Sequence, residues 1–129
     1  FESINMIKEV SEIQNWLIET LRQQTPSLRV TKDTDAAFEV TGTVPCMQGK
    51  AKVAGMYFGS VMPKAKDCRL YFFPIYTDPE RFVDLAAPVR KYLKGKSCFH
   101  IKNVTDENKA DIEKMIGLGM EIYKEKGLL

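Results

Sequence analysis

The chain has 129 residues, of which 44% are hydrophobic and 28% are charged. These proportions are typical of a globular protein and not of a disordered chain. Its 19 basic and 17 acidic side chains leave a net charge of +2, which by itself does not indicate a nucleic-acid partner. No apolar run approaches the roughly 18 residues that a membrane span requires. We therefore expect one domain, over residues 1–129, with no membrane partner.

The first predicted element is an amphipathic helix over residues 4–24. Apolar side chains recur there at steps of three and four residues, which places them on one helix face: Met6, Val10, Ile13, Leu17 and Leu21. Pro26 ends the pattern, because the residue before a proline is disfavoured in the helical region.

Three strands are predicted next, over residues 37–44, 51–61 and 68–76. The first alternates apolar and polar side chains with a period of two, as a half-buried strand does. Gly55 in the second strand indicates a bulge, a bend or a close backbone approach. Pro74 cannot donate a ladder hydrogen bond, so the third strand ends there or lies at a sheet edge.

A second helix is predicted over residues 79–94. Asp78 is placed to cap its first turn, and Pro79 suits the first helical position. Pro88 is expected to kink this helix or split it in two. Gly95 follows directly, as a glycine often does at the end of a helix.

A short strand and a last helix over residues 105–125 complete the chain. Thr105 is placed to cap this helix, and Gly119 falls on its inner face, where it would allow close approach to a sheet. The resulting order of elements predicts an α+β fold, in which helices cover one face of a mostly antiparallel sheet.

The segment KGKSCFHIKN, residues 94–103, carries the only histidine. Alternation along a strand places Phe99 and Ile101 on the core side. The opposite side then carries four side chains that we take as candidate ligand-binding residues, together with Arg69 and Tyr71 of the preceding strand: Lys96, Cys98, His100 and Lys102. The alternative is an ordinary solvated strand face.

The same row bears on thiol and metal chemistry. Cys98 and His100 supply only two metal ligands, and the flanking lysines would repel a cation. Those lysines should lower the pKa of Cys98 if its thiol is exposed, so a reactive thiol is a further alternative.

No catalytic signature is readable in the chain. It lacks a glycine-rich phosphate loop, and a single histidine leaves no recognisable serine-hydrolase constellation. We therefore expect a protein that is not an enzyme, although an unrecognised carboxylate or thiol site is an alternative. Lysines near Tyr57 and Tyr71 could form a nucleic-acid surface, but an ordinary lysine-rich surface is the favoured explanation, so we expect no nucleic-acid partner.

The three cysteines, Cys46, Cys68 and Cys98, are odd in number and widely spaced. This pattern argues against a disulfide framework. It predicts three free thiols and a cytoplasmic location.

Three segments carry a family resemblance. YFGSVMP, RLYFFPIY and YLKGKSCFHIKN, in that order before a last helix, resemble the YdhG-like family of small bacterial proteins, a domain of unknown function. The resemblance covers roughly residues 55–125. Its strongest element runs from Gly95 through Lys96 and Ser97 into Cys98 and Phe99.

The resemblance implies a frataxin-like α+β fold. Some members of the family are discussed as iron chaperones, so iron is the cofactor or cargo that the resemblance suggests. In frataxin-like proteins iron lies along an acidic ridge on the first helix and adjoining strand, which here implies four candidate metal ligands: Glu9, Glu12, Asp33 and Asp35.

The sequence therefore predicts a non-enzymatic binding or chaperone-like module, with iron delivery as the most specific function that the resemblance offers. The main alternative is a binder of a small molecule or peptide that uses the open sheet face around Cys98 and His100. Neither the sheet order nor the oligomeric state follows from the sequence.

Overall fold

The structure is a computed structural model that describes residues 6–129. Its helices are α1 (Val10–Arg22), α2 (Phe73–Thr77), the 3-10 helix η1 (Pro79–Phe82), α3 (Ala87–Arg90) and α4 (Asp106–Glu125). Its strands are β1 (Met6–Ile7), β2 (Arg29–Asp33), β3 (Phe38–Thr41), β4 (Cys46–Gln48), β5 (Ala51–Val53), β6 (Tyr57–Pro63), β7 (Cys68–Phe72), β8 (Leu93–Lys94), β9 (Cys98–Ile101) and β10 (Val104–Thr105).

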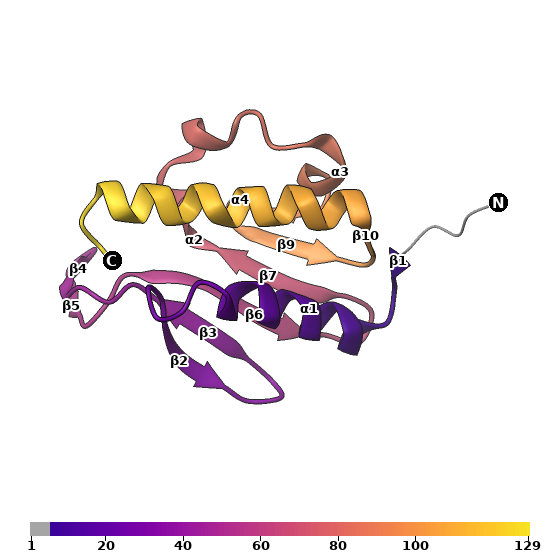
Figure 1. The fold of residues 1–129 in the computed structure, drawn as a ribbon, viewed down its shortest axis with the longest axis horizontal. Coiled ribbons are helices and arrows are strands. Elements are labelled where there is room, and N and C mark those ends of the chain that lie inside the picture. The colour runs from indigo at the N-terminus through magenta and orange to yellow at the C-terminus, as the bar shows by residue number, and fades with distance from the viewer. Residues whose placement is uncertain (1–5) are drawn as a thin grey trace.

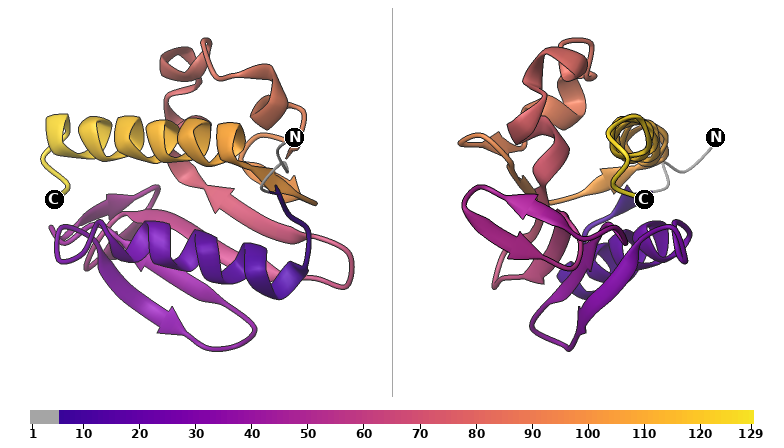
Figure 2. Two further views of the ribbon diagram at one scale, coloured as in Figure 1. Left: turned by 45° about the vertical axis from the view of Figure 1, so that its right-hand side comes forward. Right: turned by 90° about the vertical axis from the view of Figure 1, so that its left-hand side faces the viewer.

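The main sheet has six strands in the order β2-β3-β6-β7-β9-β8, and every neighbouring pair is antiparallel. Helices α1 and α4 lie side by side across one face of this sheet (Figures 1 and 2). The segment containing α2, η1 and α3 packs beside α4, on the side of that helix away from α1 (Figure 1). The predicted α+β fold with a mostly antiparallel sheet is confirmed, and the face turned away from α1 and α4 is called the open face below.

The hydrophobic core fills the space between the sheet and the two long helices. Alternate residues of β3, β7 and β9 point into it, while Ile13, Leu17 and Leu21 face them from α1. Gly119 of α4 lies against the ring of Phe72, where an added Cβ atom would stand 2.7 Å from a ring carbon. The predicted close approach at this glycine is confirmed.

Strand β9 has the predicted alternation. Phe99 and Ile101 are 0% and 1% exposed, whereas Cys98 and His100 are half-buried on the open face. The predicted cap of the last helix is also confirmed: the Thr105 hydroxyl accepts from the backbone N–H of Asn108, whose side chain accepts from the N–H of Thr105.

The predicted helix over residues 4–24 is correct only from Val10 onward. Met6 and Ile7 form β1, which pairs with β10, so Met6 is 38% exposed and does not belong to the buried helix stripe. Residues 4 and 5 lie outside the described part of the chain.

The predicted helix over residues 79–94 is wrong as a single element. Pro79 and Pro88 each lie in the first turn of a separate short helix, η1 and α3, because proline favours helix starts and interrupts helix interiors. Leu93 and Lys94 pair with Phe99 and Cys98 as strand β8. Asp78 does not cap η1.

Other predicted boundaries also change. The strand predicted over residues 51–61 is divided near Gly55, because β5 pairs with β4 whereas β6 pairs with β3 and β7. A Cβ atom added at Gly55 would lie 1.8 Å from the Gly42 carbonyl oxygen, so the predicted close backbone approach is confirmed. Strand β2 and the β4–β5 hairpin were not predicted. The strand predicted over residues 68–76 ends at Phe72, and Pro74 lies in the short helix α2.

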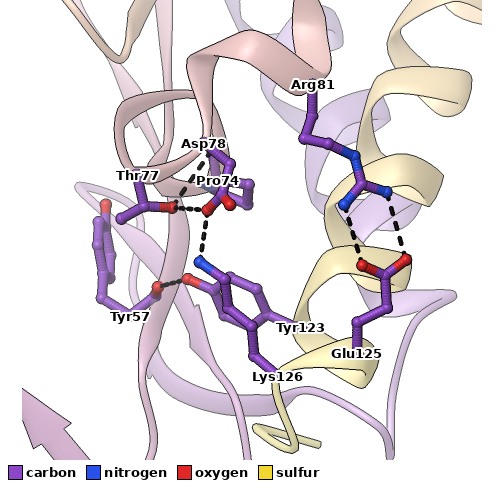
Figure 3. Close-up of polar contacts among 8 residues, drawn as sticks. All are labelled: Tyr57, Pro74, Thr77, Asp78, Arg81, Tyr123, Glu125 and Lys126. Atoms are coloured by element: carbon purple, nitrogen blue, oxygen red, sulfur yellow. Dashed lines mark hydrogen bonds and ion pairs between the residues drawn. The ribbon is translucent and has the colours of Figure 1, made fainter.

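Three polar contacts tie residues 57–82 to the end of α4 (Figure 3). The Asp78 carboxylate accepts from the Thr77 hydroxyl at 2.7 Å and from the Lys126 ammonium at 2.5 Å. Arg81 donates to both oxygens of Glu125, at 2.9 and 3.3 Å. The Tyr123 hydroxyl donates to the Tyr57 carbonyl.

The two faces of β9 should differ in their effect on stability. Phe99→Ala is expected to lower the free energy of unfolding by about 3–5 kcal/mol, because it leaves a cavity in the core. His100→Ala, on the open face, should change it by roughly 0.5 kcal/mol. Urea denaturation of both variants tests this, and a larger loss for His100→Ala would show that the faces are assigned in reverse.

The contacts of Asp78 predict a pH-dependent contribution to stability. Burial opposes ionisation of this carboxyl, but hydrogen bonds from Lys126 and Thr77 outweigh it and hold its pKa below the ordinary value. A lowered folded-state pKa stabilises the fold above the unfolded-state pKa of about 3.9, and the contribution is lost as the pH falls further.

Asp78→Asn should therefore lower the free energy of unfolding by about 1 kcal/mol at pH 7. The difference from the unmodified protein should shrink toward zero at pH 3. Urea denaturation at both pH values measures it, and a difference that stays constant with pH would contradict the assigned role of the carboxylate.

Candidate functional site

Four of the six predicted ligand-binding residues meet on the open face. Strands β7 and β9 pair so that Arg69 lies opposite His100 and Tyr71 lies opposite Cys98. Since directly opposed side chains on one face of an antiparallel pair are neighbours, these four form one continuous patch. The patch contains two basic groups, a phenol and a thiol.

A buried carboxylate that sequence reasoning missed lies beside this patch. Asp67 is only 8% exposed, and its Oδ1 accepts from Arg69 Nε at 3.2 Å. Its Oδ2 lies 3.9 Å from His100 Nδ1. The burial of Asp67 depends on β9 lying next to β7, which no local sequence pattern indicates.

A cavity of about 290 Å³, called the lysine pocket below, opens next to Asp67. Its lining contains a tyrosine, the histidine, three lysines and one acidic residue: Tyr92, His100, Lys91, Lys94, Lys102 and Asp67. The Lys91 ammonium also lies 5.2 Å from the centre of the Tyr92 ring. One cavity thus contains His100 and Lys102, both predicted from the alternation. It also contains Lys91 from the turn before β8 and Lys94 from β8 itself.

Lys96 does not join this site. The chain reverses between β8 and β9 at Gly95, whose φ of 69° lies in the left-handed region that favours glycine. Regular alternation begins only at Cys98, so the predicted row does not extend back to Lys96. Lys96 instead lines a separate groove with Tyr76 and Arg90.

Cys98 is not an activated thiol. Burial raises its pKa, and this effect exceeds the lowering by the Tyr71 hydroxyl, Arg69 and Lys64. The expectation of a lowered pKa applied to an exposed thiol, but Cys98 is half-buried and desolvation outweighs the nearby positive charge. The hydrogen bond to Cys98 in turn raises the pKa of Tyr71.

A second polar pair extends the open face toward β6. The hydroxyls of Tyr57 and Ser60 lie 2.6 Å apart, and Ser60 is opposite Tyr71 in the β6–β7 pairing. Burial raises the pKa of Tyr57 to about 12, so this phenol is neutral at physiological pH. The pair supplies hydrogen-bonding groups and no charge.

The four candidate metal ligands do not form one site. Glu9 is the N-cap residue of α1, and Glu12 lies in its first turn. Asp33 accepts from Arg22 at 2.5 Å, and Asp35 lies in the loop after β2, where its carbonyl accepts from Gln14.

Within residues 6–129, no three His, Cys, Asp or Glu side chains gather closely enough to hold a metal ion. The predicted acidic ridge is thus not assembled as a site, since Asp33 is already paired with an arginine. Iron handling stays a prediction that rests on the family resemblance alone.

Comparison with known proteins identifies no relative: no family model, no curated protein sequence and no solved structure matches this chain. The resemblance to the YdhG-like family therefore stays a prediction. In the described part of the chain, no helix has both the length and the apolar character needed to cross a membrane.

The three cysteines are free, and their environments predict an order of reactivity. Burial raises the pKa of Cys68 to about 12, so Cys68 should react with an aromatic disulfide reagent at pH 7.5 only after unfolding. Cys98 should react more slowly than a small thiol, and Tyr71→Phe should slow it further, because the hydrogen bond from Tyr71 lowers its pKa.

Mass spectrometry of the labelled peptides identifies which thiol has reacted. The denatured protein should yield all three labelled cysteines. Rapid labelling of Cys98 in the folded protein would contradict the assignment of a half-buried, protonated thiol.

Proposed function

We propose that this chain is a non-enzymatic binding module that takes a small anionic ligand, bearing phosphate or carboxylate groups, in the lysine pocket. The observation that carries the proposal is the charge of that cavity. Three lysines and a histidine line it, and the one acidic residue of its lining, Asp67, is already paired with Arg69.

In the described part of the chain, the lysines of the pocket have no acidic partner of their own. Among residues 6–129, no carboxylate oxygen lies within 4.0 Å of the ammonium groups of Lys91, Lys94 or Lys102. Like charges that share a cavity repel one another, and an anion placed between them relieves this repulsion. A dianion meets this requirement better than a neutral ligand.

Asp67 supports such a site by orienting its neighbours. Its burial and its hydrogen bond from Arg69 hold the carboxylate in place beside His100. The Asp67 Oδ2 atom lies 3.9 Å from His100 Nδ1, which is beyond hydrogen-bond distance but close enough to interact electrostatically with the imidazole that lines the pocket.

Binding is favoured over catalysis because no activated nucleophile faces this pocket. The raised pKa of Cys98 keeps its thiol protonated at neutral pH. Three free cysteines support a reducing environment, so a cytoplasmic location is part of the proposal.

A thermal-shift experiment tests the proposed function. Inorganic pyrophosphate and succinate, each at about 10 mM and at ionic strength matched with NaCl, should raise the melting temperature by about 3 °C or more, because a ligand of the folded state stabilises it. Lys91→Ala/Lys94→Ala/Lys102→Ala should abolish the shift.

The matched control removes the same charge elsewhere. Lys50→Ala/Lys52→Ala/Lys124→Ala should leave the shift intact, since none of these residues lines the pocket. Equal loss of the shift in both triple variants would show that the shift depends only on the net charge of the protein, and this would overturn the proposal. The absence of any shift in the unmodified protein would also overturn it.

A further inference from the structure

A second, larger hollow lies at the outer end of the sheet, between α2 and the turn that joins β8 to β9. We call it the aromatic groove; its volume is about 690 Å³, and its lining includes Ile75, Tyr76, Thr77, Arg90, Leu93 and Lys96. This volume lies in the range of small-molecule sites. The groove shares no lining residue with the lysine pocket.

One wall of the groove is an exposed aromatic ring that stacks on a neighbouring ring. Tyr76 is 51% exposed, yet its ring stacks on Phe73 with centroids 5.5 Å apart and planes 23° apart. Phe73 in turn lies 5.6 Å from the ring of Tyr57. A ring that is held by its neighbours but still exposed offers a platform on which another flat ring can stack.

The charged groups that line the groove are all positive. Arg90 and Lys96 contribute a guanidinium and an ammonium, and no acidic side chain is among the lining residues. Arg90 donates from one terminal nitrogen to the Phe82 carbonyl, which restricts its orientation and leaves its other N–H groups available. Ile75 and Leu93 add apolar side chains to the lining.

The wall formed by Thr77 and Pro79 is anchored to α4. Asp78, which lies between these two residues, binds Lys126, and Arg81 binds Glu125 (Figure 3). A groove whose wall is already held in place loses less conformational entropy when a ligand binds.

We infer that the aromatic groove binds a small ligand in which a planar aromatic ring is joined to an anionic group. The ring stacks on Tyr76 between the apolar side chains, and the anion lies against Arg90 and Lys96. This chemistry is shared by nucleoside monophosphates and by aromatic carboxylates. The ring requirement distinguishes this ligand from the one proposed for the lysine pocket.

Backbone NMR titrations with matched probes test the inference. Adenosine monophosphate and indole-3-acetate carry both parts of the ligand, whereas adenosine and indole lack the anion and inorganic phosphate and acetate lack the ring. At least one two-part probe should shift the signals of residues 75–77 and 93–96 and bind about tenfold more tightly than its neutral counterpart, as loss of a charged contact predicts. If only one of the two-part probes binds, adenosine monophosphate or indole-3-acetate, the inference is supported and the preferred anion is identified.

Two variants separate the contribution of the aromatic ring to binding from that of the positive charge. Tyr76→Ala should weaken the two-part probe about tenfold, as expected from loss of a stacking partner, and Lys96→Ala should weaken it several-fold. Met47→Ala and Lys52→Ala are the controls, because both residues are exposed and lie outside the groove; they should leave the affinity unchanged.

Three results would overturn the inference: equal affinity for the neutral probes, unchanged affinity in a folded Tyr76→Ala protein, or signal shifts confined to the lysine pocket. Thermal denaturation of each variant establishes that it is folded. The Lys91→Ala/Lys94→Ala/Lys102→Ala protein should keep the groove's affinity, so failure of one site is distinguishable from failure of the other.

Discussion

The edge-to-face packing of Phe72 is the interaction on which the rest of the structure depends. Its ring lies 5.5 Å from Phe58 of β6 and 5.5 Å from Phe82 of η1, with interplanar angles of 88° and 89°. Gly119 allows α4 to approach the same ring. One buried side chain thus joins the central strands, the segment containing η1, and the long C-terminal helix. Because both layers are fixed on this face, the opposite face of the sheet carries the polar patch, and the segment beside α4 forms one wall of the aromatic groove.

Strand β8 divides the two proposed sites. Leu93 lies opposite Phe99 and lines the aromatic groove, whereas Lys94 lies opposite Cys98 and lines the lysine pocket. Successive residues of a strand point to opposite faces, so two adjacent residues serve two different cavities. The left-handed turn at Gly95 then places Lys96 on the groove side of the edge and starts β9 in the register that brings His100 to Arg69. A short strand at the edge of the sheet therefore determines where the charges of both sites lie.

The parts of the fold that the sequence predicts correctly are those encoded by local patterns. The alternation around Phe99 and the cap at Thr105 depend on a few neighbouring residues, and both are confirmed. Strand β2 was missed because it lies at a sheet edge, where charged and exposed residues replace the alternating pattern. Strand β8 was assigned to a helix because its pairing with β9 is a tertiary contact. Tertiary contacts also explain why the sites were not predicted. Asp67 acquires its role only when β7 lies beside β9, and Tyr76 only when α2 lies beside the β8–β9 turn. Neither arrangement leaves a linear motif in the sequence.

The net charge of the chain is a poor guide to what these sites bind. Residues 90–102 contain five Lys or Arg residues and no Asp or Glu, although the whole chain is nearly balanced. Electrostatic interactions between exposed groups fall off over about 8 Å at physiological ionic strength, so a ligand in either cavity experiences these basic groups far more than the distant acidic ones. The buried carboxylate of Asp67 modifies this local field without cancelling it, since Arg69 already balances its charge. The basic segment is therefore divided by β8 into two positively charged sites, and only one of them also presents an exposed aromatic ring.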